Sequence, residues 1–123
     1  MDAAGLACDD DNASAEAAFA EAVAKVGARF RESLDERMAE LEALLNLLDA
    51  HSEKGAVVQE VWVRVHKIAG VAGTVGFVRL GELAVSCEEA VIGFNKSPTD
   101  HFLDAIKDAL DAVLNEIDRV LTD

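Results

Sequence analysis

Residues 61–81 read VWVRVHKIAGVAGTVGFVRLG, and this stretch decides how the rest of the chain is interpreted. When residues are placed 100° apart around a helix, its apolar side chains and two preceding valines share one broad arc. That arc predicts a buried face made of Val57, Val58, Val61, Val65, Ile68, Ala72 and Val75. His66 lies about a third of a turn from the middle of the arc. We therefore expect its side chain on the exposed shoulder of the helix.

Two glycines share that exposed shoulder with His66. Gly70 and Gly73 follow it by one and two helical turns, and Gln59 lies on the N-terminal side. A glycine inside a helix costs roughly 1 kcal/mol relative to alanine. Their presence therefore indicates that open space is needed beside the imidazole. The alternative is an ordinary surface histidine, with glycines that only let two helices pack closely.

The local charge around His66 is opposite to the charge of the whole chain. The chain has 24 acidic and 11 basic side chains and a net charge of −13. No acidic residue falls within 61–81, whereas Arg64, Lys67 and Arg79 do. A neutral imidazole is a nucleophile near neutral pH. A cationic strip beside it suits an anion that is formed or delivered there.

The remaining pattern predicts an all-α fold in one domain. A chain of 123 residues, 51% of them apolar, is large enough for a single core. Amphipathic helices are expected over residues 13–48, 56–73, 77–93 and from about 97 to the end. We expect an up-down antiparallel four-helix bundle with an additional or kinked N-terminal helix. The bundle would occupy residues 13–123, after a disordered acidic lead-in of residues 1–12.

Two sequence signals predict helix starts. Ser33 with Glu36 has the spacing of a capping box, so the first apolar segment is either two helices or one bent helix. Ser97, followed by Pro98 and Asp100, predicts a serine cap for the last helix. His51 is expected in the loop between residues 50 and 56.

Composition argues against several classes of protein. No apolar run approaches the ~18 residues that span a bilayer, and no signal peptide is visible, so we expect a cytoplasmic protein. Cys8 and Cys87 are too few for a disulfide framework or a zinc site, and Cys87 falls in an apolar stripe where a buried thiol is expected. The acidic run at residues 9–11 lacks the pattern of a calcium loop, and no di-iron pattern is present, so no metal site is expected. The acidic balance argues against binding nucleic acid or an anionic membrane.

The run from His66 onward resembles the signature of histidine-containing phosphotransfer (HPt) domains. That signature has an apolar residue two positions after the histidine, a glycine four positions after it, and a second glycine that ends the helix. The matching residues are His66, Ile68, Gly70 and Gly76, followed by Leu80, Leu83 and Glu88 in what resembles the next helix of the family. The family often has a lysine three residues after the histidine, where this chain has Ala69.

The resemblance implies a phosphorelay intermediate. His66 would accept a phosphoryl group from the aspartyl phosphate of a response-regulator receiver domain, of a hybrid or cognate sensor histidine kinase, and pass it to another receiver. Lys67 and Arg64 would stabilise the phosphoryl charge. The docking surface would comprise Gln59, Trp62, Val63, Ala69, Gly70, Gly73 and Phe77.

The resemblance also implies that the receiver supplies Mg²⁺, so this chain needs no cofactor of its own. We expect a monomer. The chain has no glycine-rich nucleotide loop, so it is not expected to be an ATP-dependent kinase by itself. The alternative is a non-catalytic helical adaptor that binds a partner through the surface between Trp62 and Phe77.

Overall fold

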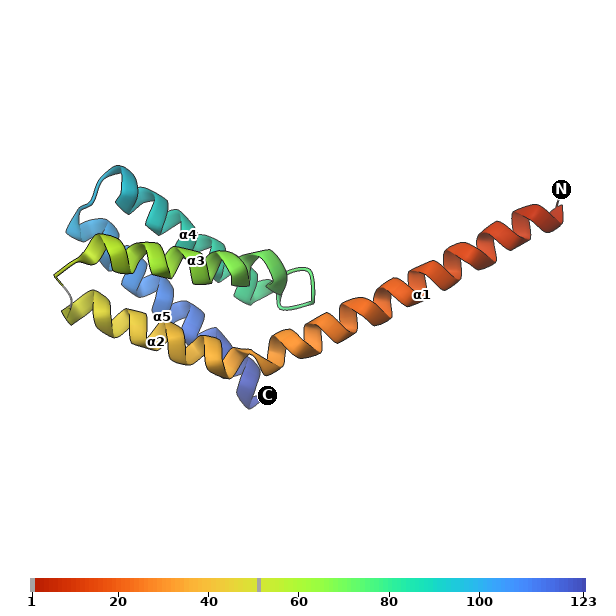
Figure 1. Cartoon of the computed structure of the whole chain (residues 1–123), viewed down its shortest axis with the longest axis horizontal. Coiled ribbons are helices and arrows are strands. Elements are labelled where there is room, and N and C mark those ends of the chain that lie inside the picture. The colour runs from red at the N-terminus through yellow and green to blue at the C-terminus, as the bar shows by residue number, and fades with distance from the viewer. Residues whose placement is uncertain (1, 51) are drawn as a thin grey trace.

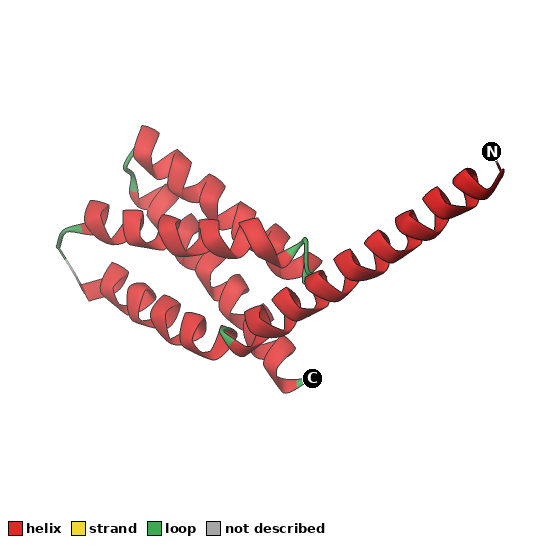
Figure 2. Cartoon of the chain, turned by 45° about the vertical axis from the view of Figure 1, so that its right-hand side comes forward, coloured by secondary structure: helices red, strands yellow, loops and turns green. Residues whose placement is uncertain are grey.

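The computed structural model describes residues 2–50 and 52–123, and the side chains of residues 13–50 and 52–123. The described chain forms five helices and no strand: α1 (Asp2–Glu32), α2 (Leu34–Ala50), α3 (Lys54–Ala72), α4 (Val78–Lys96) and α5 (Asp100–Thr122). Helices α2 to α5 run alternately up and down and form a four-helix bundle, from one end of which α1 projects (Figure 1). The short connections lie at the ends of the bundle (Figure 2). The predicted all-α bundle is confirmed.

The core is one continuous apolar cluster to which all four bundle helices contribute. Every residue of the arc predicted for α3 is buried except Val75, which is half-buried. Cys87 of α4 is fully buried, as expected, and burial raises the pKa of its thiol to about 12. The thiol is therefore almost entirely protonated at neutral pH and is a packing group, because the thiolate is the reactive form.

The junction of α1 and α2 is a bend within nearly continuous helical hydrogen bonding. The Ser33 amide donates to the Arg29 carbonyl at 3.1 Å, and the Arg37 amide donates to the Ser33 carbonyl at 3.0 Å. The Ser33 hydroxyl donates to the Phe30 carbonyl at 2.6 Å and accepts from Arg37 Nε at 2.8 Å. A serine that bonds back to the preceding turn often bends a helix. Ser33 therefore does not form the predicted capping box, although the chain does divide into two helices there, one ending at Glu32 and the next beginning at Leu34.

Helix α1 begins earlier than the predicted lead-in allows. The structure places residues 2–12 in α1, in a stretch rich in alanine, the residue with the highest helix propensity. Side chains from residue 13 to residue 29 are exposed or half-buried, and Phe30 is the first buried one. Phe30 packs on Phe77, with ring centroids 5.6 Å apart. The bundle core therefore begins at Phe30, and the domain boundary at residue 13 stays a prediction.

The start of α5 also differs from the predicted one. Thr99 is its N-cap, and the threonine hydroxyl accepts from the Phe102 amide at 3.4 Å. The serine cap predicted at Ser97 is wrong, because the helix begins two residues later than a Ser97 cap requires. The prediction for His51 lies outside the described residues.

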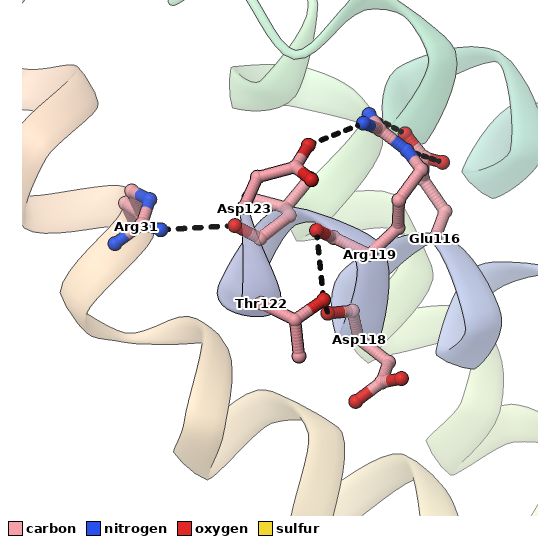
Figure 3. Close-up of polar contacts among 7 residues, drawn as sticks. Arg31, Glu116, Asp118, Arg119, Thr122 and Asp123 are labelled. Atoms are coloured by element: carbon pink, nitrogen blue, oxygen red, sulfur yellow. Dashed lines mark hydrogen bonds and ion pairs between the residues drawn. The ribbon is translucent and has the colours of Figure 1, made fainter.

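The C-terminal turn of α5 fixes the base of α1. Arg31 donates to the Val120 carbonyl at 2.9 Å, and Arg119 binds both carboxylate oxygens of Glu116 at 2.7 Å and Asp123 at 2.8 Å (Figure 3). Since the last carbonyls of a helix lack partners within it, the Arg31 contact satisfies one of them and joins the two elements.

No helix of the described chain is long and apolar enough to cross a membrane.

Candidate functional site

His66 stands midway along α3 with 58% of its side chain exposed. The exposed-shoulder prediction is therefore confirmed. Trp62, one turn earlier, stacks on the imidazole, with ring centroids 4.5 Å apart and planes 10° from parallel. This contact holds the orientation of the imidazole from one side.

The space on the other side of His66 is open. A Cβ atom built on Gly70 or Gly73 would meet no atom within 4 Å outside its immediate surroundings in the helix. A side chain at either glycine would therefore not collide with a neighbouring helix, so close helix packing does not require glycine at these two positions. Close packing belongs to Gly81 of α4, where a Cβ would lie 3.2 Å from the Gly73 nitrogen.

Gly76 turns the chain from α3 into α4. Its φ of 100° lies in the left-handed region that favours glycine. The Phe77 amide donates to the Ala72 carbonyl at 2.8 Å, and the Gly76 amide donates to the Gly73 carbonyl at 3.4 Å. These two bonds form a Schellman motif. The motif follows the end of α3 at Ala72 and leads the chain into α4 at Val78.

The turn brings Glu88 of α4 against His66. Glu88 Oε2 lies 3.2 Å from His66 Nδ1, and only 17% of the glutamate side chain is exposed. An ionised carboxylate only accepts hydrogen bonds. Nδ1 is therefore the protonated nitrogen of the neutral ring, and Nε2 keeps a free lone pair. Glu88 therefore orients the ring and favours the tautomer with the proton on Nδ1.

Arg64 and Lys67, the basic residues near His66 in sequence, both lie toward α2. Arg64 donates to Glu60 at 2.7 Å and to Glu40 of α2 at 3.1 Å. Lys67 and Arg64 line a polar cavity of about 300 Å³ between α2 and α3. The role of Arg64 and Lys67 in stabilising phosphoryl charge therefore stays a prediction. The charged side chain that reaches His66 is an acid from the next helix.

Arg79, the third cation of the strip inferred from sequence, acts on a different acid. The pKa of Glu116 is lowered chiefly by its hydrogen bonds with Arg119, and Arg79 contributes a smaller lowering. Arg79 is thereby associated with the C-terminal part of α5.

Most of the residues expected to dock a partner lie on the His66 face of α3. Trp62 and Ala69 are half-buried beside the histidine, and Val63, Gly70 and Gly73 are exposed. Gln59 is exposed and donates to Asn95 of α4 at 2.7 Å. Phe77 differs, because its ring is half-buried against Phe30 at the base of α1.

An apolar groove beside His66 was missed by the sequence analysis. It measures about 370 Å³ and is lined by Ala69, Gly73, Val78, Gly81, Glu82 and Val85. Val78 and Val85 are 56% and 44% exposed. They are two turns apart on α4, outside its buried stripe, and that spacing is the signal that could have revealed the groove.

Among the side chains that the structure describes, no group of three or more histidine, cysteine or acidic residues is placed to hold a metal ion.

The family model of the Hpt domain matches residues 26–116, which span α2, α3, α4 and most of α5. No curated protein and no solved structure matches the chain. The match covers about three quarters of the chain and includes the bundle, His66 and Glu88. The chain therefore belongs to the Hpt domain family, which performs histidine-containing phosphotransfer in two-component systems and interacts with receiver domains.

Proposed function

We propose that His66 accepts a phosphoryl group on Nε2 from the aspartyl phosphate of a receiver domain and passes it to the aspartate of another receiver. One observation carries this proposal. Glu88 holds Nδ1 at 3.2 Å, while the exposed ring is bordered by open space at Gly70. A rigid helix supports the nucleophile, so its geometry is fixed before a partner arrives.

The transfer step follows from the protonation of the ring. The Nε2 lone pair attacks phosphorus in line, the aspartyl O–P bond breaks, and the partner's carboxylate leaves with the bonding electrons. The proton stays on Nδ1, so the ring becomes positively charged. Glu88 stabilises that charge through its hydrogen bond. In the onward step, the N–P bond breaks and the leaving group is the neutral ring, still protonated on Nδ1.

In this proposal, groups of the receiver domain stabilise most of the negative charge on the phosphoryl oxygens. Arg64 is paired with two carboxylates, and Lys67 lies beside the imidazole around the helix. We assign to the receiver a Mg²⁺ ion, which neutralises phosphoryl oxygens, and a lysine. Lys67 contributes from the flank. A receiver that belongs to a hybrid or cognate sensor kinase would place this protein in the cytoplasm.

The surface around His66 suits a partner that combines apolar and polar contacts. The groove at Ala69, Val78 and Val85 offers apolar area, and Glu82 marks its polar edge. A helix or loop of the receiver would occupy this groove while the acceptor aspartate reaches Nε2. A non-catalytic adaptor would use the same groove, so only an assay of phosphoryl transfer distinguishes the two functions.

The deciding experiment supplies a ³²P-phosphorylated receiver domain to the protein. We expect label on the wild-type chain that acid removes and base does not, and no label on His66→Gln. His101→Gln is the matched control, because His101 is exposed in the first turn of α5. Receiver binding without label on the wild-type chain would support the adaptor. Label that persists in His66→Gln would refute the site.

A further inference from the structure

Helix α1 carries an apolar stripe that no described part of the chain covers. Phe19 is 69% exposed and Val26 is 47% exposed, with the half-buried Val23 between them. The structure describes bundle contacts of α1 near its C-terminal end, where Gly27 approaches Val75 and Phe30 packs on Phe77. The rest of α1 extends away from the bundle (Figures 1 and 2).

The spacing of the stripe is that of a seam between two helices. Phe19, Val23 and Val26 follow one another at intervals of four and three residues, and Phe30 of the bundle core continues the spacing four residues later. This is the alternation of the a and d positions of a coiled coil. Ala15 and Ala22 flank the seam with small side chains, which lets a second helix approach closely.

The charges of α1 favour a second copy of the same helix in the opposite direction. The acids of its N-terminal part are Asp2, Asp9, Asp10, Asp11, Glu16 and Glu21, and the bases that follow are Lys25, Arg29 and Arg31. An antiparallel pair sets the acidic part of each helix beside the basic part of the other. A parallel pair would set acids beside acids. The helix dipoles also oppose one another in the antiparallel pair.

We propose that two copies of this chain associate through α1 as an antiparallel pair, with Phe19 of each copy packed on Val23 of the other. Such an interface is twofold symmetric. The acidic start of one helix then reaches the base of the other bundle. There Arg29 and Arg37 line a groove of about 250 Å³.

The paired helices leave His66 free, since His66 lies midway along α3 against α4. Residues 13–29 are about 25 Å long. A helix pair of this length lies at the small end of specific interfaces, which usually bury about 800 Å² per partner. We therefore expect a dimer that forms at micromolar concentration, in place of the monomer expected from sequence.

Sedimentation velocity of the full chain across the micromolar range tests the proposal. The mass should rise from 13.1 kDa toward twice that value as concentration increases. Phe19→Gln should remain monomeric, while Leu47→Gln, which changes a 42% exposed apolar residue on α2, should dimerise like the wild type. Phe19→Gln should still accept phosphate from a receiver, so a failed dimer and a failed phosphotransfer site give different results.

A charge variant tests the orientation of the helices. Replacing both Lys25 and Arg29 with glutamate should weaken the dimer at least tenfold, and added salt should weaken the wild-type dimer. Unchanged association of this variant would refute the antiparallel pair. A wild-type chain that stays monomeric would refute the dimer. If the wild-type chain is a monomer and Phe19→Gln lowers its stability, the stripe packs against its own bundle. That result would also refute the dimer.

Discussion

At His66 the two ring nitrogens have different surroundings, because only Nδ1 lies against a carboxylate of the described chain. Nδ1 faces a mostly buried carboxylate at 3.2 Å, whereas the exposed part of the ring borders open space at Gly70. Trp62 stacks on the imidazole and limits its rotation. The imidazole is therefore oriented by two contacts, and none of the described neighbours obstructs its open side.

Glu88→Gln should slow phosphoryl transfer to His66 by roughly 10- to 100-fold, the loss seen when metal-ligating histidines lose the carboxylate that accepts their other N–H. A neutral amide cannot stabilise the positive ring, and it can also select the wrong tautomer. The measurement is the rate of transfer from a phosphorylated receiver, with circular dichroism to check the fold. Glu89→Gln, the adjacent exposed acid, is the control and should transfer normally. Equal rates in the two variants would show that Glu88 has no role.

Lys67→Ala should reduce the transfer rate by no more than about fivefold, because an exposed charge contributes at most about 1 kcal/mol. Lys67 lines the cavity between α2 and α3, and in the proposed transfer it would approach the phosphoryl group from the flank. Rapid-quench kinetics at low and high salt measure this contribution. A loss of several orders of magnitude would make Lys67 a principal stabilising group, and an unchanged rate would make it a bystander.

At the scale of the element, α3 was predictable from sequence and its partner contacts were not. The apolar period predicted which residues of α3 are buried, and the predicted end at residue 73 lies one residue beyond Ala72, the last residue of α3. Two predicted caps were wrong, at Ser33 and Ser97, because a serine can bond backward along a helix or remain outside it as well as cap it. Nothing in the local pattern places Glu88 beside a histidine 22 residues earlier. That contact depends on how the Gly76 turn sets α4 against α3.

Substitutions at Gly70 should change the stability of the fold and the rate of phosphoryl transfer in opposite directions. Gly70→Ala fills open space and should stabilise the chain by roughly 0.5–1 kcal/mol, because alanine is the better helix former. Gly70→Gln should keep the fold and block the receiver sterically. Thermal melts and transfer rates measure the two effects.

Gly55 is the matched control for this series, since it lies in α3 and a Cβ there also meets no atom within 4 Å. Gly55→Gln should leave transfer unchanged. Normal transfer by Gly70→Gln would mean that no partner approaches this face.

At the scale of the whole molecule, a chain with a net charge of −13 is held together by the core of its bundle and by a few paired charges. Lys107 of α5 binds Asp49 of α2 at 2.7 Å, and this hydrogen bond lowers the pKa of Asp49. Arg119 lowers the pKa of Glu116 in the same way. The overall bundle could be predicted from helical periodicity. The projection of α1 could not, because it depends on the bend at Ser33.

These two pairs predict a loss of stability in acid. A carboxyl whose pKa is lower in the folded state than in the unfolded state stabilises the fold above its ordinary pKa, which is near 4. That stabilisation disappears as the pH falls through the folded-state value. The double variant Asp49→Asn, Glu116→Gln should therefore lose less stability than the wild type between about pH 5 and pH 2. Urea unfolding at each pH measures the difference, and Glu42→Gln, an exposed acid of α2, should follow the wild type. Parallel curves for the double variant and the wild type would contradict this account.

The central claim concerns one atom, Nε2 of His66, and nitrogen NMR of the phosphorylated chain tests it most directly. The protein would be labelled with ¹⁵N in its histidines and phosphorylated by a receiver domain. We predict that phosphorus couples to Nε2 of His66, with Nδ1 still carrying its proton toward Glu88. Phosphorus on Nδ1 of His66, or on a different histidine such as His101, would contradict the account.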